Sequence, residues 1–124
     1  MKLIDSSSWI EALRQDGDPV VKSRVDSLLR SDRAAWCDMV RIELWNGARG
    51  LTERRTLESY DDAVQLLPTT DAVWAKARVL AQRSRAKGLT LPSADLVIAA
   101  CAWEHGVEME HDDAHLKMLA ALFD

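Results

Sequence analysis

Four acidic residues stand beside hydrophobic segments at widely spaced points along the chain. They are Asp5, Glu43, Asp95 and Asp113. An isolated carboxylate is costly to bury, so acids next to core-forming segments need a compensating partner. The economical explanation is that the four meet around a divalent cation, because carboxylate oxygens suit Mg²⁺ and Mn²⁺. We therefore predict that these four acids form a metal site.

The sequence around these acids alternates short apolar strands with helices. Strands are expected at residues 2–4, 34–36 and 107–109, with a strand or a turn at 66–68. Helices are expected to follow the serines at 6–8, to begin at Thr52, and to cover about 20–30, 38–48, 70–87, 94–105 and 114–123. The first of these is expected to place Trp9, Ile10 and Leu13 on its inner face. Thr70 is expected to cap the helix that it begins, and Gly106 to end the helix at 94–105. This alternation predicts an α/β domain with a short parallel sheet covered by helices on both sides.

The predicted sheet gives the four acids a common location. In a parallel sheet the reactive crevice lies beyond the carboxyl ends of the strands. Asp5 and Asp113 each follow an expected strand, whereas Glu43 and Asp95 lie in early turns of expected helices. All four side chains are therefore expected to face one crevice.

Helix capping is the competing role for these acids, because Asp is favoured at an N-cap and negative charge is favoured near a helix N-terminus. We expect one of the serines at 6–8 to cap the first helix, which leaves Asp5 for the cation. Ser93 is expected to cap the helix that contains Asp95. Asp38 is expected to be only the cap of its own helix.

Length and composition limit the class of protein. The chain has 124 residues, which suits one domain, and 48% of them are hydrophobic, enough for a core. The sequence reaches Asp5 before a signal-peptide core could form, and its apolar runs are shorter than a membrane span, so we expect a cytoplasmic protein. A net charge of −4 argues against a surface coated in basic charge. Acids gathered at a metal site would leave the remaining surface closer to neutral.

Four segments, in this order, carry a resemblance to a known family. They are Ile4–Ile10, Val40–Leu44, Leu91–Ala100 and His111–Leu116. Together they resemble the PIN-domain ribonucleases, specifically the VapC-type toxins, and the resemblance covers essentially the whole chain as one PIN domain, residues 1–124. The chain departs from that family at His115 and Leu116, where an acid and an aromatic residue are common, and at Glu110, where the family tends to be apolar.

The resemblance implies a metal-dependent endoribonuclease that acts as the toxin of a type II toxin–antitoxin pair. It implies an RNA substrate, a VapB-like antitoxin whose tail occupies the acidic groove, and a homodimer. The residues that it assigns to catalysis and to binding Mg²⁺ or Mn²⁺ are Asp5, Glu43, Asp95 and Asp113, with Ser7 and Asp112 as candidates for support.

The same residues allow three other interpretations: a phosphoryl-transfer enzyme, a non-catalytic binding module and a zinc site. An α/β phosphoryl-transfer enzyme with an aspartyl nucleophile would place a second acid two residues after the first, where this chain has Ser7. A non-catalytic PIN-like module that binds RNA or protein would be expected to lack one of the acids, and this chain keeps all four. Zinc binding by His111 and His115 with the acids lacks a Cys or a third His to complete the ligand set.

Overall fold

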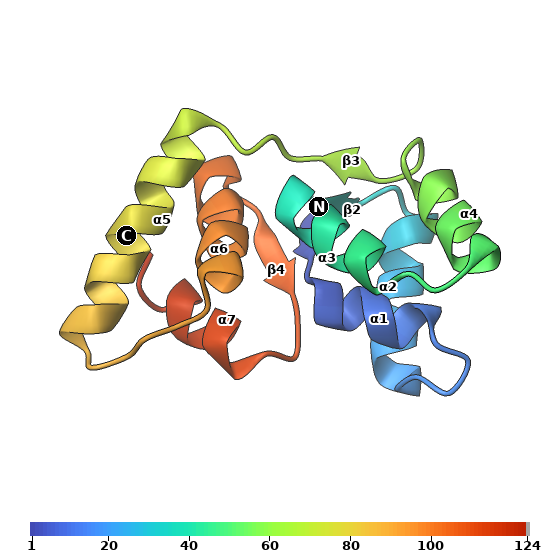
Figure 1. Cartoon of the computed structure of the whole chain (residues 1–124), viewed down its shortest axis with the longest axis horizontal. Coiled ribbons are helices and arrows are strands. Elements are labelled where there is room, and N and C mark those ends of the chain that lie inside the picture. Colours follow the sequence, from blue (N-terminus) through green and yellow to red (C-terminus); the bar gives the residue numbers. More distant parts are fainter. Residues whose placement is uncertain (124) are drawn as a thin grey trace.

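Two helices separate each strand from the next along the chain, and one helix follows the last strand (Figure 1). The computed structural model describes residues 1–123, which form four strands and seven helices. In chain order the elements are β1 (Lys2–Ile4), α1 (Ser6–Leu13), α2 (Pro19–Arg30), β2 (Ala34–Trp36), α3 (Asp38–Gly47), α4 (Leu51–Tyr60), β3 (Gln65–Leu66), α5 (Asp71–Ala86), α6 (Ser93–His105), β4 (Glu108–Glu110) and α7 (Ala114–Ala120).

The four strands form one parallel sheet with the order β3-β2-β1-β4. The central strand β1 pairs with both β2 and β4, so that Leu3 lies opposite Ala35 on one side and Met109 on the other. Leu3, Ile4 and all of β2 are buried, as expected for a parallel sheet with helices on its faces. The predicted α/β class is confirmed.

Helices flank the strands in two groups. Figure 1 shows α5, α6 and α7 towards one end of the long axis and α1, α2 and α4 towards the other, with α3 and the strands nearer the middle. In the first group α6 packs against both α5 and α7, and its residues 97–102 are all buried. Small side chains such as Ala99 and Ala100 allow this close packing on every side of α6. Gly106 ends α6 in the left-handed conformation, as its position in the sequence predicted.

The core face predicted for α1 is only partly buried. Trp9 of α1 is fully buried and contacts Trp36 and Tyr60, with ring centroids 5.5 Å and 5.2 Å away. Ile10 and Leu13, however, are 44% and 39% exposed. They line a groove of about 660 Å³ that is also bordered by residues of α3 and α4, among them Glu43. Helical periodicity identified the buried side of α1, but the groove leaves part of its apolar surface open.

The helix lengths also limit how the chain can meet a membrane. Within residues 1–123, none of the helices combines the length and the apolar character needed to cross one.

Candidate metal centre

The sheet brings the first and last acids to neighbouring positions. β1 and β4 are parallel neighbours, and both end at the same edge of the sheet. The backbone N–H of Asp5 donates to the carbonyl oxygen of Glu110 at 3.0 Å, which extends the pairing one residue past β1. The chain then turns through residues 111–113 into α7. Asp5 and Asp113 therefore emerge at adjacent strand ends.

Asp5 is itself the N-cap of α1, which corrects the expectation that a serine has this role. Its Oδ2 accepts hydrogen bonds from the Ser7 N–H at 3.2 Å and from the Ser7 hydroxyl at 2.5 Å. The serines at 6–8 are already helical, whereas Asp5 has the extended backbone that an N-cap residue adopts. Both bonds go to one oxygen of a carboxylate that is only 3% exposed. Capping therefore does not use the whole carboxylate.

Glu43 lies in the second turn of α3, in the early part of the helix as the sequence predicted. Its Oε1 accepts a hydrogen bond of 2.9 Å from the hydroxyl of Ser6, across 37 positions of sequence. Burial raises the pKa of Glu43, opposed by the bond from Ser6, and the negative charges of Asp5, Asp95 and Asp113 raise the pKa further. Glu43 thus lies within electrostatic reach of the other three acids.

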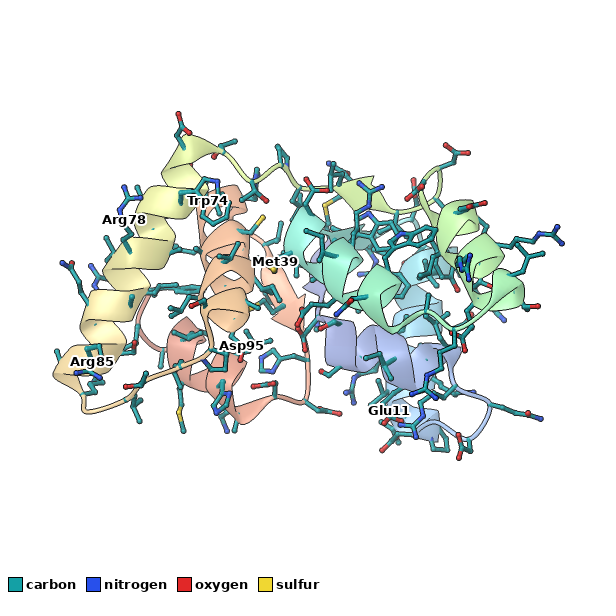
Figure 2. All side chains as sticks on the ribbon, viewed as in Figure 1. Glu11, Met39, Trp74, Arg78, Arg85 and Asp95 are labelled. Carbon is teal, nitrogen blue, oxygen red and sulfur yellow. The ribbon has the colours of Figure 1, made fainter. Side chains whose placement is uncertain are left out.

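Asp95, Asp113 and His115 form the tightest part of the cluster. Each offers one potential ligand atom, and these atoms lie within 4.8 Å of one another. The Nδ1 of His115 is 3.3 Å from Oδ2 of Asp95 and 3.9 Å from Oδ1 of Asp113. Figure 2 shows Asp95 at the end of α6 that is nearest to α7. Burial first, and then the charge of Asp113, raises the pKa of Asp95.

The N-cap predicted for α6 is wrong, and the N-cap of α7 is one of the four acids. Pro92, not Ser93, is the N-cap residue of α6, and a proline side chain has no acceptor to offer, so Asp95 is the acid in the first turn of a helix that has no side-chain cap. Asp113 is the N-cap of α7, and its Oδ1 accepts from the N–H groups of His115 at 2.7 Å and Leu116 at 3.2 Å. As with Asp5, the capping bonds use one carboxylate oxygen.

The structure separates Asp112 and Asp38 from the cluster. Asp112 is exposed and both of its carboxylate oxygens accept hydrogen bonds of 3.1 Å from Arg24 in α2. Asp38 lies in the first turn of α3, where Cys37 is the N-cap residue, and it pairs with Arg41. Asp38 is therefore not the cap that the sequence predicted, because the helix begins one residue earlier than that role requires.

Sequence reasoning missed Glu110 and Arg24, and it weighed His115 only as a zinc ligand. His115 appeared as a departure from the family pattern, yet its ring lies between two of the acids. Glu110 is only 6% exposed and forms an ion pair with Arg24. The available signal for Glu110 was an acid directly after a predicted strand, at a position where the family tends to be apolar, but its partner is 86 positions away in sequence.

The donor set fits a hard divalent cation. Asp95, Asp113 and His115 offer ligand atoms within 4.8 Å of one another, and Asp5 and Glu43 lie within electrostatic reach of this group. Carboxylate oxygens are the ligands that Mg²⁺ and Mn²⁺ prefer. Burial is the main reason that the pKa values of Glu43 and Asp95 are raised, and the negative charge of the neighbouring acids adds to it. A bound cation would reverse that balance.

Comparison with known proteins identifies the family. The chain matches the PIN domain family model over residues 2–122. It is 32% identical over 107 residues to Ribonuclease VapC21 of Mycobacterium tuberculosis, which covers 84% of this chain and 78% of that protein. It is also 32% identical over 126 residues to Ribonuclease VapC11 of the same species, covering 98% of this chain and 93% of that protein.

A solved structure shows the same fold at low sequence identity. VapBC2 from Rickettsia felis, bound to a DNA fragment from its promoter, superposes with a TM-score of 0.76 at 12% identity, covering 94% of this chain and 91% of that chain. Taken with the family match over residues 2–122, these findings show that the chain belongs to the PIN-domain family. Within that family it is a VapC-type protein.

Proposed function

We propose that this chain is a Mg²⁺- or Mn²⁺-dependent endoribonuclease and the toxin of a type II toxin–antitoxin pair. The observation that carries the proposal is the cluster of Asp95, Asp113 and His115, whose ligand atoms lie within 4.8 Å of one another, with Asp5 and Glu43 within electrostatic reach. The relatives named ribonucleases support the same activity. An alternative role as a non-catalytic PIN-like module is less well supported, because all four acids are present and within electrostatic reach of Glu43.

Each acid has a part in the proposed site. Asp95 and Asp113 would hold the cation together with His115, whose ring nitrogen is within reach of both. Asp5 and Glu43 would complete the oxygen ligands, oriented by the hydroxyls of Ser7 and Ser6 respectively. When bound, the divalent cation would offset the negative charge of the scissile phosphate and lower the pKa of a coordinated water.

The hydrolysis also needs a proton acceptor. One of the four carboxylates would accept the proton of the attacking water. Ser7 would keep Asp5 in a fixed orientation, because its hydroxyl and its backbone N–H both donate to the same oxygen. Attack by water on the phosphodiester, with the 3′ oxygen as leaving group, leaves a 5′-phosphate and a 3′-hydroxyl.

Cleavage of RNA by the purified chain tests this proposal. We expect internal cuts in RNA that need Mg²⁺ or Mn²⁺, that stop on addition of EDTA, and that leave 5′-phosphate ends. Transfer of phosphate to the protein itself would instead support an aspartyl-nucleophile enzyme. RNA binding without cleavage under any of these metal conditions would favour the non-catalytic module. Because His115 adds a nitrogen ligand, Zn²⁺ should be compared directly with the other two ions.

The proposed protein partner is a VapB-like antitoxin with an arginine in its tail. An arginine guanidinium can pair bidentately with carboxylates and compete with a cation for them. The groove beside Glu43 has exposed apolar side chains, Ile10 and Leu13, on which apolar residues next to that arginine could pack. A homodimer is proposed on the VapC resemblance, and light scattering of the purified chain would measure its mass.

Neutralising two of the acids should weaken binding of the antitoxin as well as slow RNA cleavage. We expect the double variant Asp5→Asn, Asp95→Asn to bind the VapB-like antitoxin at least about tenfold more weakly than wild type does. The reason is that truncating one side of a buried charge pair costs several kcal/mol. Calorimetry measures this affinity. The control is Asp26→Asn, Asp71→Asn, which removes the same charge from exposed positions in α2 and α5. Equal affinity for the site variant and wild type would place inhibition elsewhere on the surface.

A further inference from the structure

Arg24 connects α2 to the turn between β4 and α7. Its Nε contacts the Oε1 of Glu110, and its Nη2 donates to both carboxylate oxygens of Asp112 at 3.1 Å. Glu110 is buried, whereas Asp112 is exposed. One guanidinium therefore binds two acids that are two residues apart, one on each side of His111. We refer to these contacts as the Arg24 clamp.

The turn held by the Arg24 clamp leads directly into the candidate metal centre. Glu110 is the last residue of β4, and its carbonyl oxygen accepts from the backbone N–H of Asp5. Asp112 immediately precedes Asp113, whose own N–H donates to Nδ1 of His111 at 3.1 Å. The backbone around Asp113 is thus fixed by the sheet on one side and by Arg24 on the other.

A purely stabilising role would not require this arrangement. A buried carboxylate is costly even when it is paired, and an apolar residue of similar size at the position of Glu110 would often be neutral or better for stability. An ion pair with arginine instead fixes positions, because the planar guanidinium determines where both carboxylates lie relative to it. Here the defined segment is residues 110–113, which positions the N-cap carboxylate of α7.

We propose that Arg24 is a positioning residue, whose clamp on Glu110 and Asp112 holds the turn at 110–113 so that Asp113 and His115 stay beside Asp95. Arg24 does not touch the reacting atoms. The part of this proposal that concerns metal binding rests on the proposed function, whereas the part that concerns the turn does not.

Whether removal of Arg24 weakens or tightens metal binding distinguishes a positioning role from a purely electrostatic one. Arg24 is a cation near the site, and its removal would also leave Glu110 and Asp112 unpaired and negative. By electrostatics alone, Arg24→Gln should bind a divalent cation more tightly than wild type. Loss of positioning has the opposite effect, since losing an outer-shell partner of a metal ligand typically weakens metal affinity by about 10- to 100-fold.

Three variants and two measurements test the Arg24 clamp. Arg24→Gln removes the charge and the fork, and Arg24→Lys keeps the charge but cannot bind both acids in the same way. The matched control is Arg30→Gln, which breaks the exposed pair with Asp26 in the same helix. Mn²⁺ affinity is measured by calorimetry, and amide hydrogen exchange of residues 108–116 is measured in the metal-free protein.

We expect Arg24→Gln to weaken Mn²⁺ binding by about tenfold or more and to speed exchange in residues 108–116. Arg24→Lys should fall between Arg24→Gln and wild type, and Arg30→Gln should match wild type in both measurements. If Arg24→Gln does not fold, Arg24→Lys decides the question alone. Unchanged or tighter Mn²⁺ binding in Arg24→Lys, together with unchanged exchange, would overturn the proposal. If wild type bound no Mn²⁺, the proposed function would fail, and hydrogen exchange would still decide whether Arg24 holds the turn.

Discussion

Asp95→Asn is expected to reduce RNA cleavage by a factor on the order of 10² to 10³ while the chain stays folded. Losses of this size follow when one preorganised group that stabilises transition-state charge is removed. Asparagine keeps the shape of the side chain but is a neutral and weaker cation ligand. Asp95 lies within reach of both His115 and Asp113, so its carboxylate charge is central to the tightest part of the cluster. Gel-based cleavage of RNA under single-turnover conditions measures the effect.

The same substitution should raise the stability of the metal-free protein. Burial and the charge of Asp113 raise the pKa of Asp95, so its ionised form is unfavourable in the folded state at neutral pH. Asp38→Asn is the matched control, because Asp38 is also an acid in the first turn of a helix. That control loses the favourable contact with the helix dipole and the pair with Arg41, and should melt slightly lower with cleavage unchanged. Full cleavage by Asp95→Asn would remove Asp95 from the proposed site.

Mn²⁺ at about 100 times its dissociation constant is expected to raise the melting temperature by about 10 °C. A ligand that binds only the folded state at that concentration adds about 2.7 kcal/mol to the free energy of unfolding. For a chain of this size, 1 kcal/mol corresponds to roughly 4 °C. Melts with and without Mn²⁺ at fixed ionic strength measure the shift. An unchanged melting temperature at millimolar Mn²⁺ would count against the metal site.

This metal-induced shift should also depend on pH in a defined direction. Glu43 and Asp95 have pKa values raised above their ordinary 4.5 and 3.8 in the metal-free fold. As pH falls through those raised values, the folded state takes up protons before the unfolded state does, so these two groups destabilise the metal-free protein less. Metal must displace the same protons, so its stabilising effect should be full near neutral pH and should shrink as pH falls towards 4.5. Asp95→Asn should show a smaller shift at every pH.

Much of the fold follows from local features of the sequence. Residues 2–4 and 34–36 were predicted as strands, and both are strands of one parallel sheet. Thr70 was predicted to cap the long helix α5, and its hydroxyl accepts from the N–H of Val73. Such features can be predicted because periodicity, caps and breaks depend on residues within a few positions of one another. The positions of the four acids relative to the strand ends were predicted in the same way.

The partners of the site residues could not be predicted on that basis. Ser6 donates to Glu43 across 37 positions, and Arg24 pairs with Glu110 across 86. No local pattern distinguishes a serine that caps a helix from one that orients a distant acid, because the choice depends on which helices pack side by side. Tertiary packing likewise left Ile10 and Leu13 open to a groove, although their spacing alone predicted a buried face.

The sequence by itself determined the alternation of strands and helices and the set of acids that could meet at the ends of the strands. Tertiary structure decided that Asp5 and Asp113 each cap a helix through one oxygen, and that His115 lies beside Asp95. The physical reason is the distance in sequence over which the deciding interactions act. Backbone conformation is set largely by neighbours in sequence, whereas the free energy of a buried charge depends on every group that the fold brings within a few ångströms of it.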